Sequence, residues 1–144
     1  MTTLLPASMA LLGGIVICLQ SQFSGTIGLK LGLMESVFIV HLGGLVLAAF
    51  IMLFLRGGNL AAWRTVPLHA LSAGFIGVVI ISTISYAVPR LGLGTTLTLS
   101  IVAQLILGAV LDHFGLLGAV HRPLDLSRAI GMLVLFVGTW LMVR

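Results

Sequence analysis

Uncharged polar side chains lie deep inside long apolar segments of this sequence. Gln104 lies near the middle of "SIVAQLILGAVLDHFGLLG", and Gln20 and Ser24 follow the midpoint of an earlier apolar run. Polar groups at such a depth need a partner in protein or in a hydrated cavity. Amides donate to and accept from a solute without carrying charge, which favours recognition of a neutral or zwitterionic molecule.

Each of these residues also has a structural interpretation. The Gln104 amide would join two helices, a contact worth about 0.6 kcal/mol on average in measured bundles. Gln20 and Ser24 share one helix face at about 100° per residue, and this face would be either a hydrated surface or the wet end of the helix. We assign these three residues to substrate binding together with Ser100. In a pair of antiparallel copies, we expect Gln104 and Gln20 of both copies to face one central hydrated cavity.

Two further candidates for substrate binding are His41 and Tyr86. His41 lies about two turns inside the second apolar segment, where a neutral imidazole bonded within the bundle is favoured over a proton carrier. Tyr86, in "SYAVP", is near the end of the third segment, which favours an interfacial tyrosine over a gate or pocket wall. No metal or cofactor is expected, because the histidines lack ligand spacing. They are His41, His69, His113 and His121.

Acidic residues are scarce, with three in the whole chain. Asp112 ends the fourth apolar segment, where a carboxylate opposes the helix dipole, and this predicts a salt bridge to Arg122 or Arg90. Glu35 lies close to Lys30 in sequence and is most simply an interfacial charge. Because acids are so few, Asp112 and Glu35 are also our candidates for gating or coupling.

The composition shows what kind of elements position these residues. The chain is 60% hydrophobic and 7% charged, whereas soluble domains carry roughly 25% charged residues. This is an integral membrane protein. Its net charge of +4 comes from basic residues near segment ends, which are typical of topology signals and lipid contacts, and no nucleic-acid partner is expected.

Helix-breaking residues divide the 144 residues into five spans, each of which needs about 17–25 residues to cross the hydrocarbon. The third span is predicted to stop before Pro89, which removes a backbone donor. The runs are too long and too uniform for strands, so the fold class is an all-α bundle in a single transmembrane domain, 1–144. The predicted helices are Leu4–Gly28, Ser36–Leu55, Leu68–Val88, Gly94–Leu111 and Leu126–Val143.

Positive charges are nearly balanced between the two sides that five spans define. The side of the N-terminus holds Arg56, Arg64, Arg122 and Arg128, and the other side holds Lys30, Arg90 and Arg144. A clear Lys/Arg excess normally sets orientation, so four against three sets none. Either lipid or insertion effects decide, or the chain inserts both ways and assembles as an antiparallel homodimer.

The dimer interpretation has further support in the sequence. Five helices are too few to enclose a polar pathway on every side, and many transporters enclose it with two inverted repeats. Because the number of spans is odd, the two chain ends lie on opposite sides of the membrane. A second copy joined end to end would therefore have the inverted orientation. Gly131 and Gly138, seven residues apart, share one face of the last helix and are the predicted dimer interface. The alternative is chance in a chain with 18 glycines.

Two stretches carry a resemblance to a known family. "VPRLGLGTTLTLSIVAQLILGAVLDHFGLLG" and "HRPLDLSRAIGMLVLFVGTWLMVR" closely resemble the C-terminal half of the YdcZ-like proteins, five-helix members of the drug/metabolite transporter superfamily. "LQSQFSGTIGLKLG" and "VHLGG" match more loosely. The resemblance implies a multi-pass protein of the bacterial cytoplasmic (inner) membrane that exports a metabolite or drug, and it is consistent with dual topology and opposed pairs.

Some residues depart from that pattern. The related small multidrug-resistance proteins exchange protons for cations at a glutamate in the first helix, where this chain has Gln20 and Gln22. Proton-coupled cation export is therefore not expected. Ser24 replaces an asparagine common among relatives, and Glu35 and His41 are unusual for the family.

Taken together, the sequence predicts a secondary transporter that works by alternating access as an antiparallel homodimer. Its site would lie at the midplane, between the first four helices of each copy. Its partners would be a second copy of itself, the lipid bilayer and a small-molecule substrate. A dual-topology ion channel and an accessory membrane subunit are the alternatives. Enzyme activity is not expected, because no nucleophile has a base placed beside it.

Overall fold

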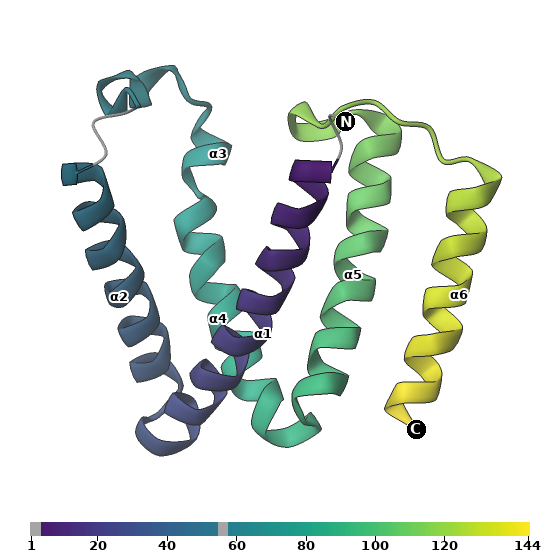
Figure 1. The fold of residues 1–144 in the computed structure, drawn as a ribbon, viewed down its shortest axis with the longest axis horizontal. Coiled ribbons are helices and arrows are strands. Elements are labelled where there is room, and N and C mark those ends of the chain that lie inside the picture. The colour runs from purple at the N-terminus through teal and green to yellow at the C-terminus, as the bar shows by residue number, and fades with distance from the viewer. Residues whose placement is uncertain (1–3, 55–57) are drawn as a thin grey trace. The chain divides into compact units, whose positions relative to one another are not determined.

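The computed structural model describes residues 4–54 and 58–144, and every regular element in these residues is helical (Figure 1). Five helical stretches are long and apolar enough to cross a membrane, so the predicted number of spans and the all-α class are confirmed. The elements are α1 (Leu4–Leu31), α2 (Leu33–Phe54), η1 (Leu60–Thr65), α3 (Leu68–Leu71), α4 (Ala73–Leu91), α5 (Leu93–Phe114), η2 (Leu116–Gly118) and α6 (Leu126–Val143).

The predicted boundaries agree to the residue at the last span and within about three residues at the ends of the others that the structure describes. The span Leu126–Val143 has the bounds of α6. The third span was expected to stop before Pro89, and this was wrong, because α4 continues to Leu91 with Pro89 inside it. The missing N–H removes only one bond of the final turn, which the helix tolerates two residues before it ends. Leu55, the predicted end of the second span, lies outside the described residues.

Single glycines make two of the connections between spans. Gly32, between α1 and α2, has φ 120°, and Gly92, between α4 and α5, has φ 81°. A side chain would be strained at either position, whereas glycine adopts positive φ freely. Gly32 also keeps the backbone paired, because its N–H donates to the Gly28 carbonyl at 3.2 Å and its carbonyl accepts from the Ser36 N–H at 3.1 Å.

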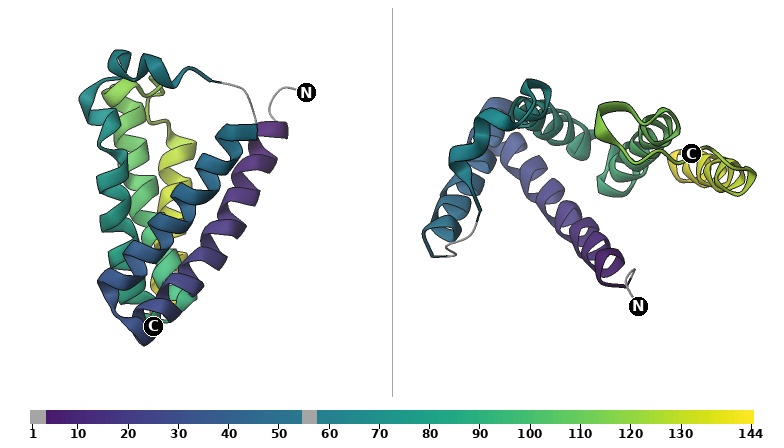
Figure 2. Two further views of the ribbon diagram at one scale, coloured as in Figure 1. Left: turned by 90° about the vertical axis from the view of Figure 1, so that its left-hand side faces the viewer. Right: turned by 90° about the horizontal axis from the view of Figure 1, so that it is seen from above.

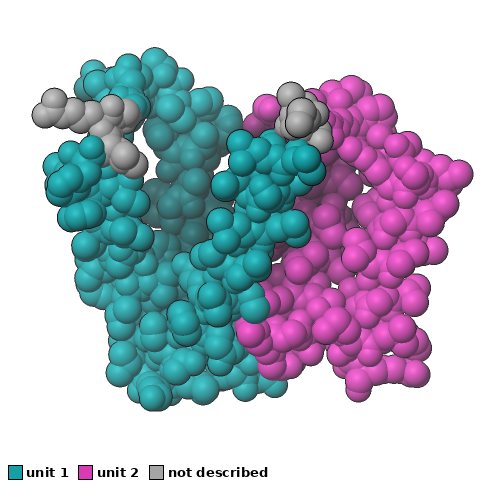
Figure 3. All heavy atoms as spheres, in the orientation of Figure 1, with its two compact units in different colours: residues 1–90 teal, residues 91–144 magenta. Residues whose placement is uncertain are grey.

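Residues 1–90 form one of two compact units (Figure 3). In this unit α1 and α2 join at Gly32 and spread apart toward their other ends, as Figures 1 and 2 show. The C-terminal half of α1 packs tightly on α4. A Cβ on Gly25 would lie 2.9 Å from Val88 Cγ1, and one on Gly28 would lie 3.2 Å from Ser85 Cβ. Small residues therefore let these two backbones approach closely.

Residues 91–144 form the second unit, in which α5 and α6 lie side by side (Figures 1 and 2). The Thr98 hydroxyl of α5 donates to the Met142 sulfur of α6 at 3.3 Å. Asp125 caps the start of α6, since its carboxylate accepts from the Arg128 backbone N–H and the Ser127 hydroxyl, each at 2.8 Å. These bonds hold the pKa of Asp125 below its ordinary value, and the bond from the Arg128 backbone N–H has the largest effect.

The interior of the chain is more polar than its surface. Within the most apolar part of each span, only 6% to 11% of the residues are buried inside the chain. The buried side chains include a set of hydroxyls, while most large apolar side chains point outward. This distribution is typical of a protein in a lipid bilayer, because apolar side chains can contact lipid tails without a free-energy penalty. The buried hydroxyl residues are Ser21, Ser24, Ser36, Ser85, Thr96 and Thr139.

Candidate functional site

Three serine hydroxyls meet where α1, α2 and α4 come together. Ser24 Oγ lies 2.5 Å from Ser85 Oγ and 3.1 Å from Ser36 Oγ, and the oxygens of Ser36 and Ser85 are 3.1 Å apart. Ser36 Oγ also lies 2.8 Å from the Ser24 backbone carbonyl, to which it donates. We call Ser24, Ser36 and Ser85 the serine cluster.

The serine cluster satisfies its own hydrogen bonds. The Ser36 proton is committed to the Ser24 carbonyl, since a carbonyl only accepts. Either of the other two hydroxyls then donates to its neighbour, and the remaining one donates to Ser36 Oγ. Ser24 and Ser36 are 0% exposed and Ser85 is 2% exposed. The cluster is therefore a closed polar joint between three helices, and a solute reaches it only if the helices separate.

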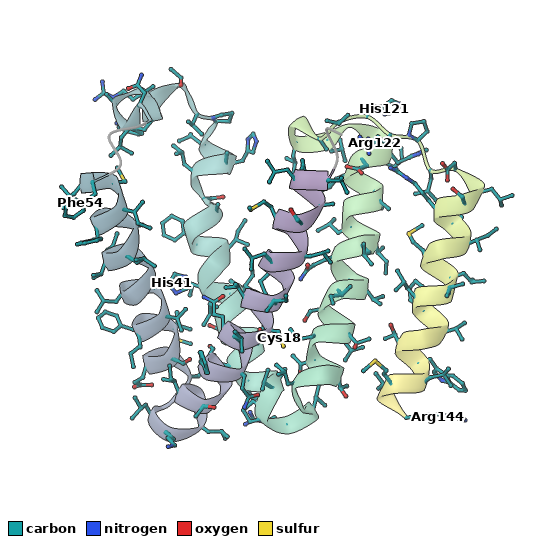
Figure 4. All side chains as sticks on the ribbon, in the orientation of Figure 1. Cys18, His41, Phe54, His121, Arg122 and Arg144 are labelled. Carbon is teal, nitrogen blue, oxygen red and sulfur yellow. The ribbon has the colours of Figure 1, made fainter. Side chains whose placement is uncertain are left out.

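His41 lies in a groove of the same unit, formed by α1, α2 and α4. The groove has a volume of about 450 Å³, and its lining includes Gln20, His41 and Gly77. The imidazole leaves α2 on the side that faces α4 (Figure 4). Its Nδ1 lies 2.8 Å from the Val37 carbonyl, and a Cβ on Gly77 would be 3.1 Å from Nε2. The bonded imidazole expected from the sequence is thus present, with its second nitrogen turned to the groove.

Gln104 lines a second groove, between α5 and α6. This groove has a volume of about 380 Å³, and its lining includes Gln104, Gly108, Asp112, Arg128 and Gly131. Gln104 is halfway along α5, while Asp112 lies in the last turn of α5 and Arg128 in the first turn of α6. The groove therefore offers an uncharged amide at depth and one charge of each sign toward one end.

The two glutamines occupy different grooves. Gln20 lines the groove of residues 1–90 and Gln104 that of residues 91–144. Both side chains are exposed, and neither amide makes a hydrogen bond within the described parts of the chain. Gln104 thus joins no two helices there. An amide in this condition at mid-membrane needs water, a solute or a partner protein.

Ser24 and Ser100 differ from the glutamines. Ser24 belongs to the closed serine cluster, although it is one turn from Gln20 on the same helix. The Ser100 hydroxyl donates to the Thr96 carbonyl of its own helix at 2.8 Å, and Ser100 is not part of the groove lining around Gln104. Of these predicted binding residues, the glutamines and His41 face open grooves.

Tyr86 forms a pair with Arg90 at the end of α4. The guanidinium carbon lies 3.7 Å from the ring centre, and one guanidinium nitrogen donates to the Tyr86 carbonyl at 2.7 Å. Arg144 lies in the same way over Trp140, at 4.1 Å. Stacked cations on half-exposed aromatic rings at helix ends are typical of the membrane interface. The arrangement favours the interfacial interpretation of Tyr86 over a gate.

The acidic candidates make fewer contacts than expected. The salt bridge predicted for Asp112 is not found among residues 4–54 and 58–144. Asp112 instead meets Arg122 through the backbone, where the Arg122 N–H donates to the Asp112 carbonyl at 2.8 Å. This bond closes the turn after α5 and leaves the carboxylate free to face the groove. Glu35 lies in the first turn of α2, where a carboxylate is favourable to the helix dipole.

Gly131 and Gly138 both border open space, since a Cβ on either would meet no atom within 4 Å. Gly131 also lines the groove around Gln104, so its missing side chain widens that groove. Gly138 has no such role in the part of the chain that the structure describes. The dimer interface at Gly131 and Gly138 stays a prediction.

Sequence reasoning missed several residues of these sites. Ser36 and Ser85 complete the serine cluster, and Arg128 supplies the positive charge of the second groove. A usable signal was present in α1, where small residues recur at intervals of three and four, which is typical of close helix packing. They are Ser21, Ser24, Gly25 and Gly28. Within the described residues, no group of histidine, cysteine or acidic side chains is arranged to hold a metal ion.

A comparison with protein families gives one match. Residues 5–141 match the model of a family described as "Putative inner membrane exporter, YdcZ". The matched range takes in nearly all of the five spans and both grooves. No curated protein and no solved structure matches the chain.

Proposed function

Because the chain belongs to the YdcZ family of inner membrane exporters, we propose that it is a secondary transporter subunit for a small polar solute without net charge. The family consists of exporters and not of enzymes, and its members lie in the inner membrane. The family match supports export across the inner membrane as the general activity. The side chains of the two grooves support the choice of substrate class and mechanism.

The observation that carries the proposal is the exposed Gln104 amide halfway along a membrane span. Leaving an amide without a partner in hydrocarbon costs several kcal/mol, so the groove around it must hold water, a solute or a protein partner. A solute that donates to and accepts from this amide would satisfy it. When the solute leaves, water would have to replace it, which fits a pathway open to one side at a time.

The charges of the same groove narrow the substrate class. Asp112 and Arg128 both line it, and they carry opposite charges. A carboxylate binds an ammonium group, and a guanidinium binds a carboxylate or phosphate. A solute with one group of each kind, or a neutral hydrogen-bonding solute, matches this lining. A bare cation would meet Arg128 as a like charge.

The antiparallel homodimer remains part of the proposal. The spans bury little of their surface inside the chain, and both grooves are open. A second copy would close them, and five spans per copy require that an inverted repeat be supplied by a second chain in the opposite orientation. The basic residues within the described parts lie at span ends or in the connections between spans, as a topology signal requires. Arg56, the remaining one, lies outside those parts.

The experiment is a thermal-shift screen in detergent followed by flux in liposomes. Neutral and zwitterionic solutes such as sugars, amides and amino acids should include one that raises the melting temperature. A solute at about 100 times its dissociation constant stabilises a protein by about 2.7 kcal/mol, which gives a readily measured shift. Stabilisation by organic cations alone would contradict the substrate class.

Counterflow then separates a carrier from a channel. Liposomes loaded with the unlabelled solute should transiently accumulate the labelled solute against its gradient, because a carrier exchanges one for the other. Conductance that persists without any solute would show a fixed permeation path and would contradict alternating access.

A further inference from the structure

His41 stands apart from the other residues of its groove because it can change its charge. The groove walls come from α1, α2 and α4, and the remaining lining residues are Gln20 and apolar or glycine residues. The other titratable side chains of these helices do not belong to the lining. They are Cys18 and Lys30 on α1, Glu35 on α2, and Tyr86 and Arg90 on α4.

The contacts of the imidazole fix which nitrogen carries the proton. Nδ1 lies 2.8 Å from the Val37 carbonyl, and a carbonyl oxygen only accepts, so Nδ1 carries hydrogen. In the neutral ring Nε2 is then a bare acceptor. It faces Gly77 across the groove, and within the described residues it makes no hydrogen bond. The glycine leaves the space that a solute or water needs to reach Nε2.

A neutral imidazole in this state can take up a proton without losing its existing bond. Protonation at Nε2 gives an imidazolium, while Nδ1–H continues to donate to Val37. Histidine is the side chain most often used to exchange protons near neutral pH. The Gln20 amide lines the same groove and offers an oxygen that could accept from Nε2–H. The groove therefore has the parts of a proton-binding site without a carboxylate.

Protonation and solute binding would exclude each other at Nε2. The lone pair accepts a donor group of the solute only while the ring is neutral, and the imidazolium repels that donor. One proton would thus leave when the solute binds and return when the solute leaves. Across a membrane with a proton gradient, this exchange couples the outward movement of the solute to the inward movement of a proton.

We propose that His41 Nε2 is the proton-binding site of this exporter and competes with the hydrogen-bond donor of a solute that occupies the groove around His41. The proposal rests on the exporter function proposed above and adds its coupling ion.

The first test observes the proton alone. Nitrogen-15 NMR spectra of histidine-labelled protein are recorded between about pH 5 and pH 9, a range that spans the ordinary imidazole pKa. The signals of His41 are those missing from the His41→Asn variant, whose amide can still donate to Val37. We expect an Nδ1–H tautomer at high pH and reversible protonation of Nε2 as the pH falls. The opposite tautomer, or the absence of titration, would overturn the proposal.

The second test observes competition. The solute library is screened by thermal shift at pH 6 and pH 8 with the wild type and with His41→Asn. Once the ring is mostly protonated, competition by the proton weakens solute binding by about tenfold for each further unit that the pH falls. Solutes should therefore stabilise the wild type less at pH 6, and this difference should vanish in the variant. Equal pH dependence in both proteins would overturn the coupling.

The two tests separate this inference from the function on which it rests. If no solute stabilises either protein at either pH, the proposed substrate class fails, while the NMR titration still decides whether His41 exchanges protons. If solutes bind and His41 keeps one protonation state throughout, the exporter function stands and the coupling site is wrong.

Discussion

The hydroxyl oxygens of Ser24 and Ser85 lie 2.5 Å apart although 61 residues separate them in the sequence. Ser36 lies 3.1 Å from each, so the serine cluster ties α1, α2 and α4 together at one level. In lipid, apolar burial does little to fix helices against one another. Interhelical hydrogen bonds and close packing must do so, and in this unit both occur at the same crossing.

Replacing Ser85 with alanine should destabilise residues 1–90 by about 1 kcal/mol, within the range measured for hydrogen bonds in membrane bundles. The change breaks the closed set of hydroxyl bonds without adding bulk. Ser82→Ala is the matched control on the same helix, because the Ser82 hydroxyl donates only to the Val78 carbonyl of its own helix. The measurement is thermal unfolding in detergent, and equal melting temperatures for both variants would contradict the role of the cluster.

Replacing Gly25 with alanine should separate α1 from α4. The added Cβ would lie 2.9 Å from Val88 Cγ1, so one helix must move, at a cost of about 1–3 kcal/mol. Gly14→Ala is the control on the same helix, because a Cβ there meets nothing within 4 Å. It should be neutral or stabilising, since alanine favours helix more than glycine does. Destabilisation by Gly14→Ala alone would argue against this crossing.

These contacts mark the limit of prediction from the sequence. The spans were predictable because length and hydropathy are local properties, and the last helix was placed to the residue. The serine cluster was not, since it depends on which faces of three helices meet, and no periodicity encodes a pairing across 61 residues. The end of α4 was predicted too early because Pro89 was expected to stop the helix. A proline near a helix end removes only one hydrogen bond, so the helix continues past it.

The grooves show the same contrast. A polar residue at mid-span predicted that Gln104 and Gln20 need partners, and both proved exposed and open to a groove. The residues that line each groove, including Arg128 in the groove of Gln104, depend on helix packing. Ser24 shares a helix face with Gln20, yet its neighbours on α2 and α4 enclose it.

Replacing Gly138 with leucine should weaken the proposed homodimer. The added side chain fills the open space beside Gly138, where we place the partner copy. Gly131→Leu is less informative, because it also fills the groove around Gln104. Crosslinking in native membranes measures the effect, and Gly13→Leu on α1, which also borders open space, controls for added bulk. A full yield of crosslinked dimer from Gly138→Leu would place the interface elsewhere.

Both orientations should be present in the membrane. The basic residues divide four against three between the two sides, so insertion has little bias. A compartment-sensitive reporter at the C-terminus should give signal from both sides, and two or three added arginines on one side should produce a single orientation. Signal from one side only in the native chain would remove the basis for an antiparallel pair.

The most direct test of the proposed function is one preparation of Gln104→Leu in which melting temperature and solute flux are both measured. The account predicts a nearly unchanged melting temperature, because the amide makes no hydrogen bond within the described residues, and loss of flux, because the solute's own polar groups lose their partner. Leu107→Met, on the same helix and outside the groove lining, should retain both. A Gln104→Leu protein that melts lower but transports fully per folded molecule would contradict the account.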